Sequence, residues 1–321
     1  MDYFFVSVGG SYKTGSSAVI DLLREYPQTR VIEGEFKPFG GEFVRLVQDL
    51  AAGRSCDRQR LVALTKTVLG YGKKPTIANK IFSRVVRTVE PHLPELLRTS
   101  DTIKRSGRNA YFDTDGVFPD YREATNELFC ELTALNDDVR VNGPIARETL
   151  TDALRRFFFR LLSPVENTDL TVVDQLIKPQ MVGIAPFMPF ARIVIVTRDP
   201  RDQFCDIVRR RNTKSRFRGA DRARVFVEDY KKRYHSEDEL LRENSDNVLR
   251  IRFEDLVYWY TETTERLERF LNLQPDPGRR QESFDPEIAI ANTCLFRDHE
   301  DEHEIALIER GLASRLYPFP D

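Results

Sequence analysis

Residues 3–24 read YFFVSVGGSYKTGSSAVIDLLR, and this stretch decides the fold. Residues 3–8 are aromatic or β-branched with almost no charge, which predicts a strand buried on both faces of a parallel sheet. Gly9 and Gly10 end the predicted strand. Between Ala18 and Arg24 the apolar residues fall on one helical face. The intervening loop is rich in Gly, Ser and Thr, so backbone N–H groups and a helix dipole converge there and predict a phosphate site.

The order of residues in this loop argues against a nucleoside triphosphatase. In that class the lysine directly follows the last glycine, whereas here Lys13 precedes Gly15 by two positions. The run Lys13-Thr14-Gly15-Ser16-Ser17 instead resembles the 5′-phosphosulfate loop of the sulfotransferases, which use 3′-phosphoadenosine-5′-phosphosulfate (PAPS). The alternative is a glycine-serine turn with an exposed lysine, because short glycine motifs recur by chance.

A second motif, at the end of the predicted strand 191–197, carries the same resemblance. Arg198 there is similar to the arginine that holds the 3′-phosphate in sulfotransferases, and an arginine fork binds phosphate bidentately. The family usually has a serine eight residues later, but this chain has Asp206, whose carboxylate would repel a phosphate. Either Asp206 turns away or the contact is built differently. The alternative reading is that Arg198 pairs with Asp199 or Asp202 to close a turn.

Composition excludes several classes of protein. The chain has 321 residues, with 49 Lys and Arg against 51 Asp and Glu, so no global field attracts nucleic acid or a membrane. Its four cysteines are far apart in the sequence, which indicates reduced thiols in a cytoplasmic setting rather than a disulfide framework. No run approaches the ~18 apolar residues of a membrane span, and the N-terminus starts with a predicted strand rather than a signal sequence. The oligomeric state is left open.

The predicted strands alternate with helices, which indicates an α/β fold with a parallel sheet and right-handed crossovers. Beyond the first, the strands are expected at residues 29–32, 170–173, 191–197 and 248–253. The resemblance implies the P-loop NTPase-like sulfotransferase fold, flanked by helices. Residues 42–165 carry mostly helical signals without a fixed period, so we expect a helical insertion or cap inside a single domain spanning residues 1–321.

The resemblance also implies a mechanism. Sulfuryl transfer needs an in-line nucleophile, positive charge on the leaving oxygen and a base for the acceptor hydroxyl. Lys13 is placed to neutralise the leaving phosphate oxygen, with the loop N–H groups and the hydroxyls of Ser16 and Ser17 assisting. No metal is required. The candidate bases are Glu33 and Glu35, of which Glu35 better resembles a segment of heparan-type enzymes; a solvated loop glutamate is the alternative for either.

Two further residues complete the predicted site. Lys178 is similar to a loop lysine near the transferring group in carbohydrate sulfotransferases; the alternative is a solvated loop lysine. Arg297 lies in a late segment comparable with one that closes over the cofactor there; the alternative is a surface ion pair. Lys178 and Glu35 together imply a hydroxyl acceptor on a sugar or glycan. The predicted catalytic residues are Lys13, Glu35 and Lys178, and the predicted nucleotide-binding residues are Lys13, Thr14, Gly15, Ser16, Ser17, Arg198 and Arg297.

Three rival functions have some support in the sequence. His299 and His303 match the His-x-x-Glu-His pattern of inverted zinc peptidases, with Glu309 available as a third ligand, although the acidic surroundings favour a solvated helix start. A small-molecule kinase would share the strand-loop-helix cradle, because fold does not fix reaction. A non-catalytic nucleotide-binding scaffold is the third possibility.

Overall fold

The computed structural model describes most of the sheet and the C-terminal half of the chain. The described residues are 5–11, 13–35, 147–162, 170–177, 187–209, 219–243, 246–275 and 282–320, with short pieces within 124–135, 179–185 and at 217. The chain divides into two compact units, one of residues 1–5, 32–168 and 186–190, the other of residues 6–31, 169–185 and 191–321.

The predicted insertion at residues 42–165 falls largely outside the described residues. Within it the structure describes helix α9 (Arg147–Leu162), which belongs to the first unit. Its buried residues Leu150, Leu154 and Phe158 recur every fourth position, as expected for one helical face. The single domain and the extent of the insertion therefore stay predictions.

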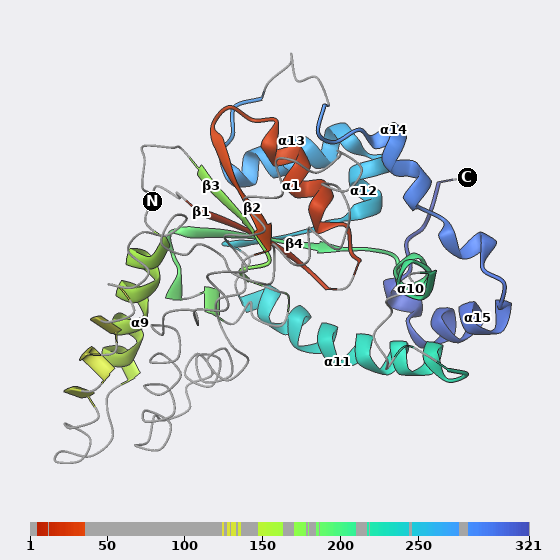
Figure 1. Ribbon diagram of the computed structural model, residues 1–321, viewed down its shortest axis with the longest axis horizontal. Coiled ribbons are helices and arrows are strands. Elements are labelled where there is room, and N and C mark those ends of the chain that lie inside the picture. The colour runs from red at the N-terminus through yellow and green to blue at the C-terminus, as the bar shows by residue number, and fades with distance from the viewer. Residues whose placement is uncertain are drawn as a thin grey trace, which may run out of the picture. The chain divides into compact units, whose positions relative to one another are not determined.

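A five-stranded parallel sheet forms the centre of the fold, in the order β2-β3-β1-β4-β5 (Figure 1). The pairing of β4 with β5 is parallel and places Ile195 opposite Arg250. This arrangement confirms the predicted α/β class. Because β1 is central, the loops that leave β1 and β4 share one edge of the sheet. The strands are β1 (Phe5–Gly10), β2 (Thr29–Glu35), β3 (Leu170–Asp174), β4 (Ala191–Thr197) and β5 (Val248–Arg252).

Two strand ends differ from the prediction. Strand β1 continues through Gly9 and Gly10 rather than ending before them. A Cβ at Gly10 would collide with the hydroxyl of Thr14, so glycine is needed there because the loop folds back onto the strand. At the other end of the sheet, Phe253 is not the last residue of β5 but the first residue of a helix, α12 (Phe253–Tyr258).

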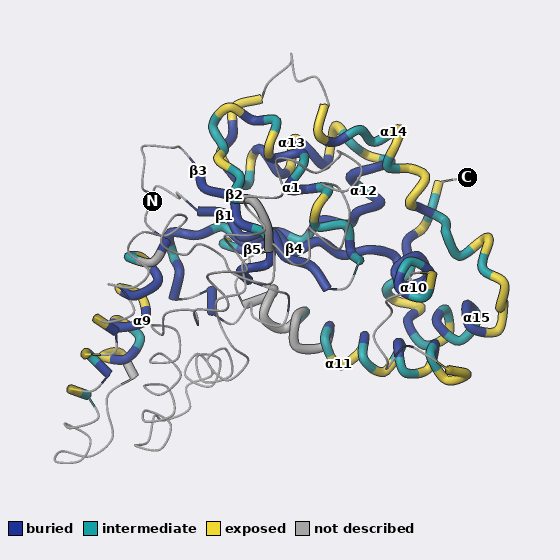
Figure 2. Tube along the Cα trace, viewed as in Figure 1, coloured by how far each residue is buried: buried dark blue, intermediate teal, exposed yellow. Residues whose placement is uncertain are grey.

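Helices α1 (Ser16–Arg24), α12 and α13 (Tyr260–Leu271) pack against one face of the sheet. They appear above the strands in Figure 1. Their buried side chains, such as Leu23, Leu256 and Leu267, form one core cluster with Val6 and Val194 of the strands. Figure 2 shows β1, β3 and β4 as almost wholly buried, which explains why these three strands do not alternate between apolar and charged residues.

A second core cluster joins α10 (Pro200–Arg209), α11 (Arg222–Glu243) and α15 (Glu302–Gly311). Phe204, Phe226 and Ile308 supply one buried side chain from each helix. Between α13 and α15 the chain forms α14 (Pro286–Ala289) and two 3-10 turns, η4 (Ile290–Asn292) and η5 (Leu295–Asp298). None of the helices in the described ranges is both long enough and apolar enough to span a bilayer.

Candidate nucleotide site

The loop between β1 and α1 has the backbone geometry of an anion cradle. Lys13 and Gly15 have positive φ angles of 59° and 83°. Gly15 directly precedes α1, and no side chain among the described residues caps this helix. The first amides of α1 are therefore open to an external acceptor. Gly15 also contacts Phe253 closely, because a Cβ at this position would lie 2.5 Å from Cδ2 of the ring.

Side chains from two other elements hold this loop in place. The Gln175 amide lies after β3 and, in the orientation that satisfies both its ends, donates to the carbonyl of Gly10 (3.1 Å) and accepts from the Ser16 hydroxyl (3.0 Å). From α10, the Gln203 amide donates to the carbonyl of Ser11 (2.7 Å). Side chains after β3 and on α10 thus hold the loop by hydrogen bonds, which preorganises its amides.

Arg198 reaches the loop directly from the end of β4. Its Nη1 donates to the carbonyl of Lys13 (3.0 Å) and to Oδ2 of Asp206 (3.0 Å), and its Nη2 donates to the carbonyl of Asn292 (2.5 Å). The guanidinium also lies over the ring of Phe253, 5.4 Å from the centroid. The structure therefore brings together the two motifs that the sequence predicted to hold opposite ends of one nucleotide.

The alternative in which Arg198 pairs with Asp199 or Asp202 is wrong. Asp199 accepts two hydrogen bonds from the guanidinium of its neighbour Arg201, at 3.0 and 2.9 Å. It also accepts from the backbone N–H of Tyr317 (2.8 Å), while its own N–H donates to Glu254 (2.7 Å). The carboxylate of Asp199 therefore binds Arg201 and Tyr317 rather than Arg198. The ion partner of Arg198 is Asp206 instead.

Asp202 ties the segment 290–298 to α10. This fully buried carboxylate accepts from the backbone N–H groups of Cys294 (2.7 Å) and Phe296 (3.2 Å). Burial raises the pKa of Asp202 to about 6, although Arg198 opposes the shift. Together with the bond from Arg198 to Asn292, these contacts lay the segment over the arginine. No sequence pattern predicts these contacts.

The remaining predicted residues are placed as follows. Thr14 is buried and Ser17 is exposed at the start of α1. Arg297 lies on η5, in the segment that covers Arg198, and its own side chain is exposed. Glu35 ends β2, but its side chain, like that of Glu33, lies outside what the structure describes. Lys178 also lies outside the described residues.

The predicted zinc ligands do not share a helical face. Asp301 caps α15 by accepting from the N–H groups of His303 and Glu304, so His299 precedes the helix. His299 Nε2 lies 2.8 Å from Glu304, and Glu309 pairs with Arg201. Burial opposes ionisation of Glu304, but hydrogen bonds from Arg222 and His299 lower its pKa. Across the described ranges, no group of three or more His, Cys, Asp and Glu is arranged to hold a metal.

Glu254 is expected to make the stability of the protein depend on pH. Its side chain is fully buried, and burial raises its pKa to about 7 from 4.5. The folded protein therefore favours the neutral acid of Glu254. The stability that this neutral side chain contributes is fully present below pH 4.5 and is lost as the pH rises through 7. Relative to the native chain, Glu254→Gln should become more stable between pH 5 and pH 8, by up to about 3 kcal/mol.

Urea unfolding at several pH values measures this difference. Glu262→Gln, at an exposed position of α13, controls for the change in net charge. A constant difference between Glu254→Gln and the native chain across this pH range would contradict the prediction.

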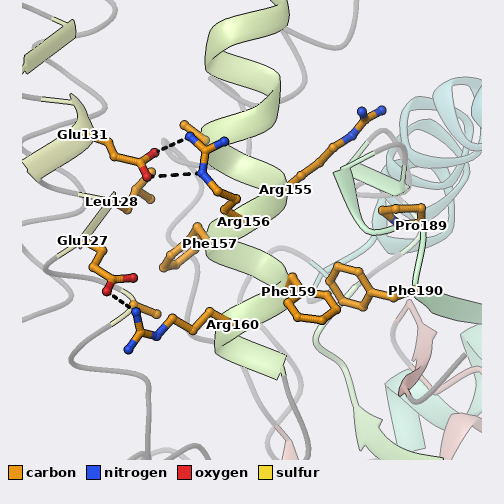
Figure 3. Close-up of a pocket in the computed structure, with 12 residues that line it drawn as sticks. Glu127, Leu128, Glu131, Arg155, Arg156, Phe157, Phe159, Arg160, Pro189 and Phe190 are labelled. Atoms are coloured by element: carbon orange, nitrogen blue, oxygen red, sulfur yellow. Dashed lines mark hydrogen bonds and ion pairs between the residues drawn. The ribbon is translucent and has the colours of Figure 1, made fainter.

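The first unit contains a pocket of about 550 Å³ (Figure 3). The rings of Phe157, Phe159 and Phe190 line it, and the last two meet edge to face at 5.4 Å. Arg156 forms two hydrogen bonds to Glu131, at 3.3 and 3.0 Å, on its polar side. The lining is apolar along these rings and charged where Arg156 meets Glu131.

Comparison with known families identifies the class of the protein. The model of the sulfotransferase family matches residues 6–277. Because this match spans most of the chain, including the loop after β1 and the arginine after β4, the chain belongs to the sulfotransferase family. A search of the curated proteins gave no significant match.

Three solved structures show a distant similarity. Sulfotransferase STF9 from Mycobacterium avium has 10% identity and a TM-score of 0.41, with 98% of this chain and 76% of that chain covered. Sulfotransferase STF1 from Mycobacterium tuberculosis H37Rv has 12% identity and a TM-score of 0.40, with 92% and 77% covered. The sulfotransferase domain from the curacin biosynthetic pathway has 14% identity and a TM-score of 0.36, with 100% and 93% covered. The family assignment rests on the sequence match alone.

Proposed function

We propose that the chain transfers the sulfuryl group of PAPS to a hydroxyl acceptor, a sugar or glycan. The observation that supports this most is the hydrogen bond from Arg198 to the carbonyl of Lys13, because it joins the arginine after β4 to an uncapped helix N-terminus. One nucleotide with phosphates on both sides of its ribose would use both elements. Membership of the sulfotransferase family supports the same reaction type.

Each proposed residue has a defined part in the transfer. The bond between sulfur and the 5′-phosphate oxygen breaks, and a new bond forms between sulfur and the acceptor oxygen. Lys13, the loop amides and the hydroxyls of Ser16 and Ser17 stabilise the charge that develops on the leaving oxygen. Glu35, with Glu33 as the alternative, takes the proton of the acceptor, and Lys178 lies beside the sulfuryl group. The scheme requires no metal.

The proposals of a carbohydrate acceptor and of a cytoplasmic location do not depend on the nucleotide site. The proposal of a carbohydrate acceptor rests on the resemblance of Lys178 and the Glu35 segment to carbohydrate sulfotransferases. Free thiols at Cys130, Cys205 and Cys294 fit a reducing cytoplasm. The near balance of 49 basic and 51 acidic residues gives no reason to expect a nucleic-acid partner.

Nucleotide binding separates this proposal from its rivals. By isothermal titration calorimetry without magnesium, adenosine 3′,5′-bisphosphate should bind at least ten times more tightly than ATP, because only the bisphosphate offers a group to Arg198. Transfer of ³⁵S from labelled PAPS to a panel of sugars then tests turnover. Tighter binding of ATP with magnesium would indicate a kinase, and binding without turnover on any hydroxyl acceptor would indicate a scaffold.

A further inference from the structure

Arg198, the residue proposed to hold the 3′-phosphate, already carries an anion of the protein itself. Oδ2 of Asp206 lies 3.0 Å from its Nη1, and the two side chains are only 4% and 22% exposed. Arg198 ends the strand side of the β4–α10 turn, whereas Asp206 lies eight residues later on α10. The pair is therefore local and buried, and Asp206 contacts the same guanidinium to which the proposed function assigns the 3′-phosphate.

One of the N–H groups of the Arg198 guanidinium lacks an acceptor among the residues that the structure describes. Nη1 and Nη2 donate to backbone carbonyls of Lys13 and Asn292. Nε is buried and has no hydrogen-bond partner within the described part of the chain. A buried donor without an acceptor is unfavourable, so a further acceptor at Arg198 would be stabilising. A phosphate offers several acceptor oxygens, where a carboxylate offers two.

Asp202 adds to the negative charge near Arg198. It is buried one turn of helix before Asp206. Arg201 does not offset this charge, because it is paired with Asp199 and Glu309. A phosphate that approaches Arg198 while Asp206 keeps its place would bring two anions to one guanidinium, which Coulomb repulsion opposes in a site sheltered from water.

We propose that Asp206 is a resident anion that the 3′-phosphate of the nucleotide must displace from Arg198, so that Asp206 sets the affinity for 3′-phosphorylated nucleotides. This inference rests on the proposed function. It has a consequence for turnover, because the product adenosine 3′,5′-bisphosphate keeps its 3′-phosphate after transfer. The return of Asp206 to Arg198 then competes with the product and hastens its release.

Calorimetry with two nucleotides that differ only in the 3′-phosphate tests the inference. The ligands are adenosine 5′-monophosphate and adenosine 3′,5′-bisphosphate, and the variants are Asp206→Asn, which keeps the shape, and Asp206→Ser, which supplies a hydroxyl. Both variants should bind the bisphosphate at least tenfold more tightly, while affinity for the monophosphate changes less than twofold. In turnover assays, inhibition by added bisphosphate should strengthen by the same factor.

Glu309→Gln is the matched control, because it also removes one negative charge from an arginine partner, but at Arg201. It should leave both affinities within twofold. Equal tightening of both nucleotides in the Asp206 variants, or no change in folded variants, would overturn the inference while leaving the proposed function intact. Failure of the native chain and all variants to bind either nucleotide would overturn the proposed function itself.

Discussion

Lys13→Ala is expected to lower kcat for sulfuryl transfer by about 10²- to 10³-fold. The reason is that the ammonium group is proposed to stabilise the oxygen that leaves sulfur, and this charge develops only in the transition state. The backbone should not change, since Lys13 already adopts a φ of 59° with a Cβ present, and alanine keeps that Cβ. Transfer of ³⁵S from PAPS, with thermal unfolding measured in parallel, provides the test.

Lys231→Ala is a suitable control for this prediction, because it removes an exposed lysine from α11. It should leave kcat unchanged. If a folded Lys13→Ala protein transferred sulfuryl groups at the native rate, the loop after β1 would not hold the reacting phosphosulfate.

Gly15→Ala should both destabilise the protein and abolish nucleotide binding. Two costs add at this position: a left-handed backbone with φ of 83°, and a Cβ only 2.5 Å from the ring of Phe253. A side chain in the left-handed region costs about 1–2 kcal/mol, and overpacking typically adds 1–3 kcal/mol. We therefore expect a loss of about 3 kcal/mol in the free energy of unfolding.

Gly219→Ala separates the two costs. Gly219 has a φ of 92°, but a Cβ there would meet no described atom within 4 Å. It should therefore show only the backbone cost, about 1 kcal/mol, and bind nucleotides normally. Equal losses of stability in the two variants, measured by urea unfolding, would show that contact with Phe253 does not constrain the loop.

The strands and the loop could be predicted because their signals are local. Apolar runs such as 191–197 and the Gly, Ser and Thr content of the loop depend on neighbouring residues only. The meeting of Lys13 and Arg198 also follows from general rules, since both follow central strands of a parallel sheet. The sequence further identified Asp206 as the position where this chain departs from its family.

Other contacts could not be predicted, because they join residues far apart in the chain. Glu254 accepts from the N–H of Asp199, and Asp202 accepts from residues more than ninety positions away. A buried carboxylate with a backbone partner has no sequence pattern, since any residue except proline offers the same N–H. The position of the Asp206 side chain could not be predicted either, because the same sequence allows Asp206 to pair with Arg198 or to point away from it.

The manner in which residues 290–298 are attached bears on how freely this region can diverge. Arg198 donates to the carbonyl of Asn292, and Asp202 accepts from the N–H groups of Cys294 and Phe296, so the hydrogen bonds to this segment involve main-chain atoms. Most amino-acid exchanges at these three sites would keep these hydrogen bonds, with proline at 294 or 296 as the exception because it has no N–H to donate to Asp202. The side chains of residues 290–298 can therefore change, by evolution or by protein engineering, with little loss of the attachment of this segment to Arg198 and α10.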